Sequence, residues 1–299
     1  MTPQAIGIDV GGTKAAAVRV GASGDVLAHA VVDTPAADVP ALLAAMLEVA
    51  TAVHTPEVSA VGVGAAGLVE TATGRVRYAP NLAWREVDLR EVLDGLGAPI
   101  VVDNDCTTAT LGELLVGAGR GVDTFLYVGV GTGIGGGLVH DGALVRGAHG
   151  FAGEIGHLIV EPDGARCGCG NRGCWETVAS GSALSRLGRE RLGASADGPA
   201  VVAAAREGNA AARSVLEDVG RRLGEGIAGL INVLDPELVI VGGGAAAGAG
   251  DLLLAPARDA CAAAVEGAGH RPDVPLVPAM LGADAAAIGA GLYALQEAA

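Results

Sequence analysis

Lysine and aromatic side chains are almost missing from this sequence of 299 residues. Lys14 is the only lysine, and phenylalanine, tyrosine and tryptophan together make up 2% of the chain. Alanine, valine and leucine supply most of the 51% hydrophobic fraction. With a formal net charge of −15, the chain is a poor partner for nucleic acid or an anionic membrane. Backbone amides could still bind a phosphate locally.

Long apolar runs and export signals are missing as well. No uncharged stretch is long enough to cross a bilayer, and the first residues lead into a strand without the basic region, apolar core and cleavage site of a signal peptide. We therefore expect a cytoplasmic protein. Of the five cysteines, Cys106 and Cys261 stand alone and are expected to be buried thiols.

The order strand, glycine turn, strand, turn, strand occurs twice, in residues 4–33 and in residues 125–145. After each copy, short apolar strands alternate with helices, which is typical of α/β folds. A chain of this length can form two lobes with cores of their own. We expect a small N-terminal lobe over residues 1–117 and a large C-terminal lobe over residues 118–284, with a terminal helix at 285–299 packing back on the first.

Apolar spacing places the remaining elements. Period-3.6 patterns predict helices at 39–53, 89–96, 107–116, 183–192, 200–207 and 210–234. Short apolar runs predict strands at 58–63, 99–102, 238–241 and 274–277.

The segment 154–176 concentrates histidine, cysteine and carboxylate side chains. Cys167, Cys169 and Cys174 follow a C-x-C-x4-C pattern, with His157 ten residues upstream of the first. Three thiolates and one imidazole complete a tetrahedral shell for zinc with no position left for water, which is typical of a structural site. Such a metal would hold this loop in one shape.

Two glutamates flank these candidate ligands. Glu154 lies three residues before His157, and Glu176 lies two residues after the last cysteine. If the first segment is helical, Glu154 and His157 share a face. A loop closed by a metal would hold both carboxylates and an imidazole edge in fixed positions, which suits a small polyhydroxylated ligand.

Other interpretations of the cysteines stay open. Two of the three could form a disulfide and leave one over, although cytosolic thiols stay reduced. All three could be buried small apolar groups, but the glycines between them favour a tight chelating loop. His157 could be the fourth ligand or a hydrogen-bonded histidine beside the metal.

Two glycine turns occupy equivalent positions in the two halves. Residues 9–14 read Asp-Val-Gly-Gly-Thr-Lys, and residues 131–133 read Gly-Thr-Gly. Glycines allow backbone N–H groups to approach phosphate oxygens, and a threonine hydroxyl adds a donor. Two such turns facing across a cleft would hold a polyphosphate from both sides.

Asp9, at a strand end, suits a magnesium ion bound through water, or it is an ordinary turn carboxylate. Neither turn matches the Walker pattern, and a strand follows the second where the Rossmann motif requires a helix.

Three polar residues, Asp103, Asn104 and Asp105, follow the strand expected at 99–102. Side chains at the carboxyl end of a strand point toward the ligand cleft of an α/β fold, and a carboxylate there could accept the proton of an attacking hydroxyl. One of the three could instead cap the next helix. A single cap does not account for the other two polar residues, which therefore stay candidates for a ligand site. Asn81 is a weaker candidate for hydrogen-bonding a ligand.

The sequence resembles the ROK family (repressors, open reading frames and sugar kinases), and in particular its ATP-dependent glucokinases. The resemblance extends from end to end and rests on Asp9-x-Gly-Gly-Thr-Lys14, Asn104-Asp105, Gly129–Gly137, Glu154-x-x-His157 and Cys167-x-Cys169-Gly-x-x-Gly-Cys174-x-Glu176. The last pattern is highly specific. The resemblance implies the actin/hexokinase-like ATPase fold, an α/β fold of two lobes, each with a β-meander plus βα units, and an interlobe cleft.

The resemblance also implies roles for the motif residues. Asp105 would be the general base acting on the sugar 6-hydroxyl. The substrate would be bound by Gly67, Asn81, Asn104, Asp105, Glu154, His157 and Glu176. ATP and Mg²⁺ would be bound by Asp9, Gly11, Gly12, Thr13, Lys14, Gly131, Thr132, Gly133, Gly243 and Gly244. A structural Zn²⁺ would be held by His157, Cys167, Cys169 and Cys174. His157 would then offer its second ring nitrogen to the sugar.

The expected reaction is transfer of the γ-phosphoryl group of Mg-ATP to the 6-hydroxyl of glucose. Polyphosphate could replace ATP, and mannose, fructose or N-acetylmannosamine could replace glucose. Leu68 argues against N-acetylmannosamine, because family members that act on this sugar carry arginine at the position of Leu68.

The family also contains sugar-responsive regulators with a basic helix-turn-helix ahead of the first glycine turn, for which a strand starting near residue 4 leaves no room. A cytoskeletal or chaperone-like ATPase of the same fold would not need the cysteine pattern. The resemblance further implies a homodimer or homotetramer.

Overall fold

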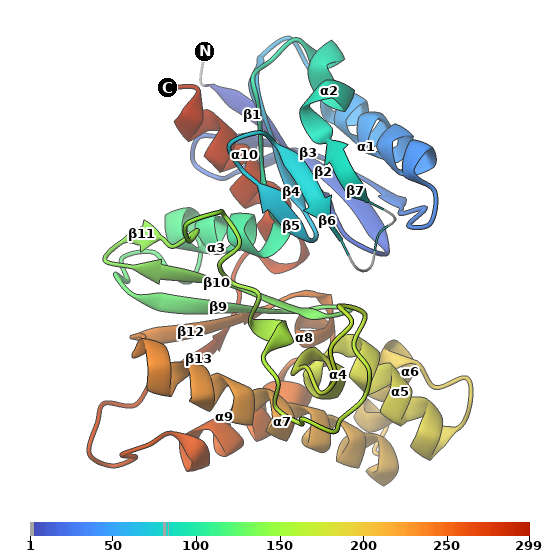
Figure 1. Cartoon of the computed structure of the whole chain (residues 1–299), viewed down its shortest axis with the longest axis vertical. Helices are drawn as coiled ribbons and strands as arrows, with labels where there is room; N and C mark the ends of the chain where they lie inside the picture. The colour runs from blue at the N-terminus through green and yellow to red at the C-terminus, as the bar shows by residue number, and fades with distance from the viewer. Residues whose placement is uncertain (1–2, 80–81, 83) are drawn as a thin grey trace. The chain divides into compact units, whose positions relative to one another are not determined.

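The computed structural model describes residues 3–79, 82 and 84–299 (Figure 1). The chain divides into two compact units. Unit 1 comprises Met1–Val122, Gly137–Gly153 and Ala283–Ala299, and unit 2 comprises Asp123–Gly136 and Glu154–Gly282. Asn81, one of the predicted substrate residues, lies outside the described part of the chain.

The sheet of unit 1 has the strand order β3-β2-β1-β4-β8. Its strands are β1 (Gln4–Val10), β2 (Lys14–Gly21), β3 (Val26–Asp33), β4 (Val58–Ala65) and β8 (Ile100–Asn104). β1, β2 and β3 form an antiparallel meander, and β4 and β8 add in parallel beyond β1. The apolar side chains of β1 and β4 are almost entirely buried, as expected for central strands covered on both faces.

The described residues of unit 1 also form helices and a small sheet. The helices are α1 (Val39–Val53), α2 (Leu89–Leu93, continued by the 3-10 turn η1, Asp94–Leu96), α3 (Asp105–Val116) and α10 (Ala285–Glu297, preceded by η3, Gly282–Asp284). The small antiparallel sheet is formed by β5 (Leu68–Glu70), β6 (Arg75–Tyr78) and β7 (Arg85–Asp88). No strand was predicted there, because three or four residues are too few for an alternating pattern to stand out.

The second five-stranded sheet repeats the order of the first. Its order is β11-β10-β9-β12-β13, with β9 (Phe125–Val130), β10 (Ile134–His140), β11 (Ala143–Leu144), β12 (Leu238–Gly242) and β13 (Leu276–Pro278). β10 and β11 are antiparallel, whereas β9, β12 and β13 run in parallel. The predicted internal repeat is therefore present as two sheets of the same topology.

The helices of unit 2 pack around its apolar core. They are η2 (Ile155–His157), α4 (Glu176–Ala179), α5 (Gly181–Leu192), α6 (Gly198–Arg206), α7 (Ala210–Leu234), α8 (Gly244–Ala249) and α9 (Asp251–Ala264). Asn209 caps α7 through its side chain, and α7 ends where Asp235 adopts a left-handed conformation, at φ 44°. Among the described helices, α7 included, none combines the length and apolarity that a membrane span requires.

Some predicted boundaries were wrong by a few residues. The helix expected from residue 107 begins at Asp105, because Asn104 is its N-cap and accepts hydrogen bonds from the backbone of Cys106 and Thr107. Similarly, Ser180 caps α5, which therefore begins at Gly181 rather than at residue 183. The helix expected at 89–96 leaves α-helical geometry after Leu93.

Helix α10 lies against the sheet of unit 1 at positions that lack side chains (Figure 1). A Cβ atom on Gly62 of β4 would lie 1.8 Å from the carbonyl oxygen of Ala290, and one on Gly7 of β1 would lie 1.8 Å from that of Ala287. On the other side of α10, a Cβ on Gly289 would lie 1.8 Å from the carbonyl oxygen of Thr108 in α3. Backbone therefore meets backbone across these contacts.

We expect Gly62→Ala to destabilise the protein severely, by about 3 kcal/mol or more, since the new methyl group meets main chain that cannot rotate away. Gly95→Ala is the matched control, because nothing lies within 4 Å of its Cβ position. Thermal and urea unfolding of both variants measures the difference. Equal stability of the two would contradict the packing described for α10.

Candidate functional site

The carboxyl ends of three parallel strands bring the predicted residues of unit 1 to one edge of its sheet. Asp9 of β1 pairs with Gly64 of β4, which in turn pairs with Asp103 of β8. Asp105 follows directly as the first residue of α3, and its Cα lies 3.3 Å from the Cβ position of Gly64. The absence of a side chain at residue 64 thus lets α3 begin against β4.

The three polar residues after β8 have different partners. Asp103 is 1% exposed and its Oδ2 accepts a hydrogen bond from Nε of Arg146 at 2.8 Å. Asn104 has two roles. Its amide oxygen caps α3, and its amide nitrogen Nδ2 donates to the carbonyl of Gly67 at 3.1 Å. Asp105 takes part in neither of these interactions, and its Oδ1 accepts a hydrogen bond from the N–H of Cys106 at 2.8 Å.

Asn104 and Gly67, both predicted to bind substrate, hold each other in place. Gly67 has φ +107°, and a Cβ there would lie 2.4 Å from the carbonyl oxygen of Tyr78, so only glycine fits. Its carbonyl accepts one amide proton of Asn104, which keeps a second proton for a ligand. Their contact with substrate stays a prediction.

Electrostatics set the carboxylates of this edge apart from ordinary ones. Burial raises the pKa of Asp105. Burial, followed by repulsion from Asp105 and from Asp284, raises the pKa of Asp9 to about 8. Asp284, the N-cap of α10, was missed by the sequence analysis because nothing near residue 284 resembles the motifs far upstream. A divalent cation fits such a group, since its charge would offset the repulsion.

The first glycine turn connects β1 and β2. The N–H of Gly11 donates to the carbonyl of Lys14 at 3.0 Å, and the N–H of Thr34 donates to the carbonyl of Thr13 at 3.0 Å. Thr13 and Lys14 are exposed, and Gly12 is half-buried. The turn is therefore tied to the end of β3 and presents its backbone and the lysine to solvent.

In unit 2, the four predicted metal ligands converge. The donor atoms of His157, Cys167, Cys169 and Cys174 all lie within 4.8 Å of one another. Sγ of Cys169 is 3.6 Å from Sγ of Cys174, and Sγ of Cys167 is 3.7 Å from Nδ1 of His157. A tetrahedral zinc with sulfur ligands at about 2.3 Å requires sulfurs about 3.8 Å apart, whereas a disulfide requires about 2.05 Å. The donor set and its spacing fit zinc, and all cysteines described are free.

The two ring nitrogens of His157 have different neighbours, because Nδ1 lies 3.7 Å from Sγ of Cys167 whereas Nε2 lies beside Glu154. Its Nε2 lies 3.7 Å from Oε2 of Glu154, with η2 placing both at the ends of one 3-10 turn. Glu176 lies beside Nδ1, and its Oε1, 2.9 Å from Sγ of Cys167, accepts a hydrogen bond from that thiol. Burial and this hydrogen bond raise the pKa of the Cys167 thiol. A metal on the sulfur would take the place of that proton.

Trp175 anchors the cysteine loop to the core of unit 2. The side chain is 1% exposed, and its Nε1 donates to the carbonyl of Arg222 in α7 at 2.9 Å. A Cβ on Gly226 would lie 2.1 Å from the indole ring, so the ring occupies a notch in the helix. Arg222 also pairs with Glu161, which fixes the loop at a second point.

The remaining predicted residues of unit 2 lie at the ends of β9 and β12. Gly243 has φ +85°, and its Cβ position lies 2.5 Å from the carbonyl oxygen of Val130, just before the Gly131 turn. The carbonyl of Gly131 accepts from Gly181 N–H at 2.8 Å, which ties the turn to the start of α5. The two glycine segments are thus neighbours.

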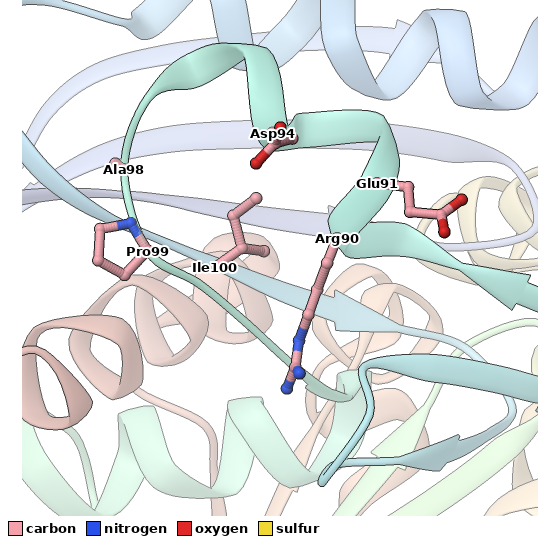
Figure 2. Close-up of a pocket in the computed structure, with 6 residues that line it drawn as sticks. All are labelled: Arg90, Glu91, Asp94, Ala98, Pro99 and Ile100. Carbon is pink, nitrogen blue, oxygen red and sulfur yellow. The ribbon is translucent and has the colours of Figure 1, made fainter.

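A cavity of about 440 Å³ lies elsewhere, between α2 and the start of β8 (Figure 2). It is lined by Arg90, Glu91, Asp94, Ala98, Pro99 and Ile100. Figure 2 shows Arg90 extending from α2 beside the segment that leads into β8, where its guanidinium donates to the carbonyls of Thr71 and Ala72. Since Asp105 follows the opposite end of β8, this cavity is not the predicted site.

The structure therefore forms two groups of predicted residues. Within unit 1 these are Asp9, Gly11, Gly12, Thr13, Lys14, Gly67, Asn104 and Asp105. Within unit 2 these are Gly131, Thr132, Gly133, Glu154, His157, Cys167, Cys169, Cys174, Glu176, Gly243 and Gly244. Besides Asp284, sequence reasoning missed Arg146, whose pairing with Asp103 spans more than forty positions and leaves no local signal.

Comparisons with known proteins bear on the family and the fold. The chain is 37% identical to the glucokinase of Streptomyces coelicolor, with 95% of each chain covered, and 36% identical to that of Halalkalibacterium halodurans, with 98% of this chain and 95% of the relative covered. A crystal structure of a ROK family glucokinase from Streptomyces griseus, in complex with glucose and AMPPNP, superposes with a TM-score of 0.92 at 37% identity, covering 98% of this chain and 99% of the other. The predicted fold class is confirmed.

Residues 5–297 match the ROK family. Together with the relatives just described, this match extends over nearly the whole chain, and the protein belongs to the ROK family.

Proposed function

We propose that the protein is an ATP-dependent glucokinase, which transfers the γ-phosphoryl group of ATP to the 6-hydroxyl of glucose. The observation that carries this proposal is the His/Cys group of unit 2 with Glu154 and Glu176 beside it. An enzyme that only hydrolysed ATP would have no use for two carboxylates held around a histidine. The glucokinase relatives support the same activity.

Asp105 is the proposed general base. It is the one member of the polar triplet that is neither the helix cap nor the buried ion pair. As the 6-hydroxyl attacks the γ-phosphorus, its proton passes to the Asp105 carboxylate, and the bond to the bridging oxygen of ADP breaks. The pKa of Asp105, raised by burial, makes it a better proton acceptor than an exposed aspartate.

Sugar hydroxyls are bound, in this proposal, by Asn104, Glu154, His157 and Glu176. Carboxylates accept hydrogen bonds from hydroxyl groups, and a site that binds each hydroxyl discriminates strongly against sugars that lack one. His157 would use Nδ1 for the metal and Nε2 for substrate, consistent with the directions of its two ring nitrogens.

The glycine turns at residues 11–14 and 131–133 would hold the phosphates, with Gly243 and Gly244 near the adenosine. Mg²⁺, held through Asp9, would neutralise charge on the phosphoryl oxygens. The zinc, by contrast, would be structural, because His157 and the cysteines leave no ligand position for water or substrate.

Other functions are less well supported. The xylose repressor of Bacillus subtilis is 32% identical, but the match covers 60% of this chain and 47% of the repressor. A polyphosphate/ATP-glucomannokinase from Arthrobacter has a TM-score of 0.68 at 29% identity, so a second phosphoryl donor and mannose belong in any substrate panel. We further propose a cytoplasmic homodimer or homotetramer.

We expect Asp105→Asn to lower kcat by about 10²- to 10⁴-fold, the usual contribution of a general base, while glucose affinity changes little. Steady-state kinetics and calorimetric glucose titration measure the two effects. Asp94→Asn, an exposed carboxylate outside the proposed site, serves as the control. The wild-type rate should also fall on acidification at a pH above the usual aspartate range, since the raised pKa of Asp105 protonates the base earlier. Near-normal turnover of Asp105→Asn would refute its role.

Removal of the metal should abolish glucose affinity, because the four side chains would lose the ion that joins them and the loop carrying Glu176 would loosen. Zinc content by mass spectrometry, with glucose titration on the same samples, tests this before and after chelation. Cys169→Ser should lose the metal, whereas Cys261→Ala, a buried thiol outside the group, should keep it. A metal-free protein with intact affinity would show that the metal is incidental.

Lys14 offers a test of the nucleotide site because no other lysine competes for amine reagents. We expect Mg-ATP to protect Lys14 from acylation while the terminal α-amino group reacts as before. Peptide mass mapping after timed labelling compares the two amines in one sample. Equal labelling of Lys14 with and without Mg-ATP would remove it from the proposed phosphate site.

A further inference from the structure

The two glycines of the Gly131–Gly133 turn have different surroundings. Neither has a left-handed φ, so the backbone would accept alanine at both. Nothing lies within 4 Å of the Cβ position of Gly131. The Cβ position of Gly133, however, lies 2.3 Å from Oε2 of Glu176. Residue 133 therefore lacks a side chain because the Glu176 carboxylate occupies that space.

Glu176 spans the distance between the cysteine loop and the start of β10. Its Oε1 lies 2.9 Å from Sγ of Cys167 and 3.8 Å from Nδ1 of His157. Its Oε2 accepts a hydrogen bond from the N–H of Ile134 at 3.4 Å. The carboxylate, only 17% exposed, thus has one oxygen on the proposed metal group and the other on the glycine turn.

The start of β10 also supports the segment that carries Glu154. The Cβ position of Gly156 lies 2.0 Å from the carbonyl oxygen of Ile134, and that of Gly136 lies 2.4 Å from the side chain of Ile155. Both acid-bearing segments of unit 2 therefore rest on β10. These further contacts involve backbone or branched side chains, so changes there would damage folding as well as the site.

We propose that Gly133 is a positioning residue for the sugar end of the site, acting through Glu176. The inference rests on the proposed function, and it separates Gly133 from Gly131: both belong to the phosphate turn, but only residue 133 determines where the Glu176 carboxylate lies. A methyl group at residue 133 displaces the far end of a flexible side chain, which costs little folding stability. The carboxylate moves, and its hydrogen bonds to the sugar are lost.

The test is Gly133→Ala, with Gly131→Ala as the matched control in the same turn. Glucose affinity is measured by calorimetry without nucleotide, alongside zinc content and melting temperature. We expect Gly133→Ala to weaken glucose binding by about ten- to a hundredfold, as for loss of a hydrogen bond to a charged group, with unchanged metal content. Gly131→Ala should bind glucose like the wild type. Equal glucose affinities of the two variants would overturn the proposal.

A double-mutant cycle separates action through Glu176 from a general disturbance of the turn. In a Glu176→Ala background, adding Gly133→Ala should weaken glucose binding no further. An undiminished effect in that background would also overturn the proposal.

A crystal structure of Gly133→Ala decides the question without any sugar. The Glu176 carboxylate should have left the N–H of Ile134, and an unmoved carboxylate would refute the inference. If the wild type bound no hexose while the carboxylate moved as expected, the proposed function would fail and the positioning role of Gly133 would stand.

Discussion

Close approach at residues without side chains is the constraint on which this structure depends. Helix α10 meets the first sheet at Gly7 and Gly62, and the Trp175 ring enters α7 at Gly226. Few large side chains are present to fill gaps, since aromatic residues make up 2% of the chain. The aliphatic cores of both units are therefore supplemented by backbone surfaces in direct contact, where even one methyl group is too large. Such contacts leave little freedom to the strand ends that carry the proposed site.

The repeated topology explains why the proposed chemistry has two positioned parts. In each sheet an antiparallel meander adjoins parallel strands, and a glycine turn follows the central strand. In unit 1 the edge strand β8 leads into the polar triplet, whose last member is Asp105. In unit 2 the equivalent turn supports Glu176 instead. One topology thus supplies a proposed base in one copy and a proposed sugar-binding acid in the other.

Much of this could be predicted from the sequence. The meanders, most helices and the convergence of His157 with the three cysteines follow from apolar period and ligand spacing, which are local signals. The small sheet β5-β6-β7 could not, because its strands are too short to show a period. Asp284 and Arg146 could not either, because their partners Asp9 and Asp103 are distant in the sequence. The family resemblance named Gly133 as a phosphate-binding residue. Its contact with Glu176 depends on how far the glutamate side chain extends in the folded protein, which the spacing of residues in the sequence does not indicate.

The position of Asp105 follows from what surrounds it. Asp103 is buried and paired with Arg146, whose guanidinium also stacks on Tyr293 of α10, 4.8 Å from the ring centroid. Asn104 joins the start of α3 to Gly67. These two contacts hold the chain just before residue 105 and so position the carboxylate of the proposed base. A closed metal group with four protein ligands can add rigidity but cannot activate a nucleophile. In the proposed reaction, proton transfer therefore falls to a carboxylate, and we assign it to Asp105, which is neither the cap of α3 nor part of the buried ion pair.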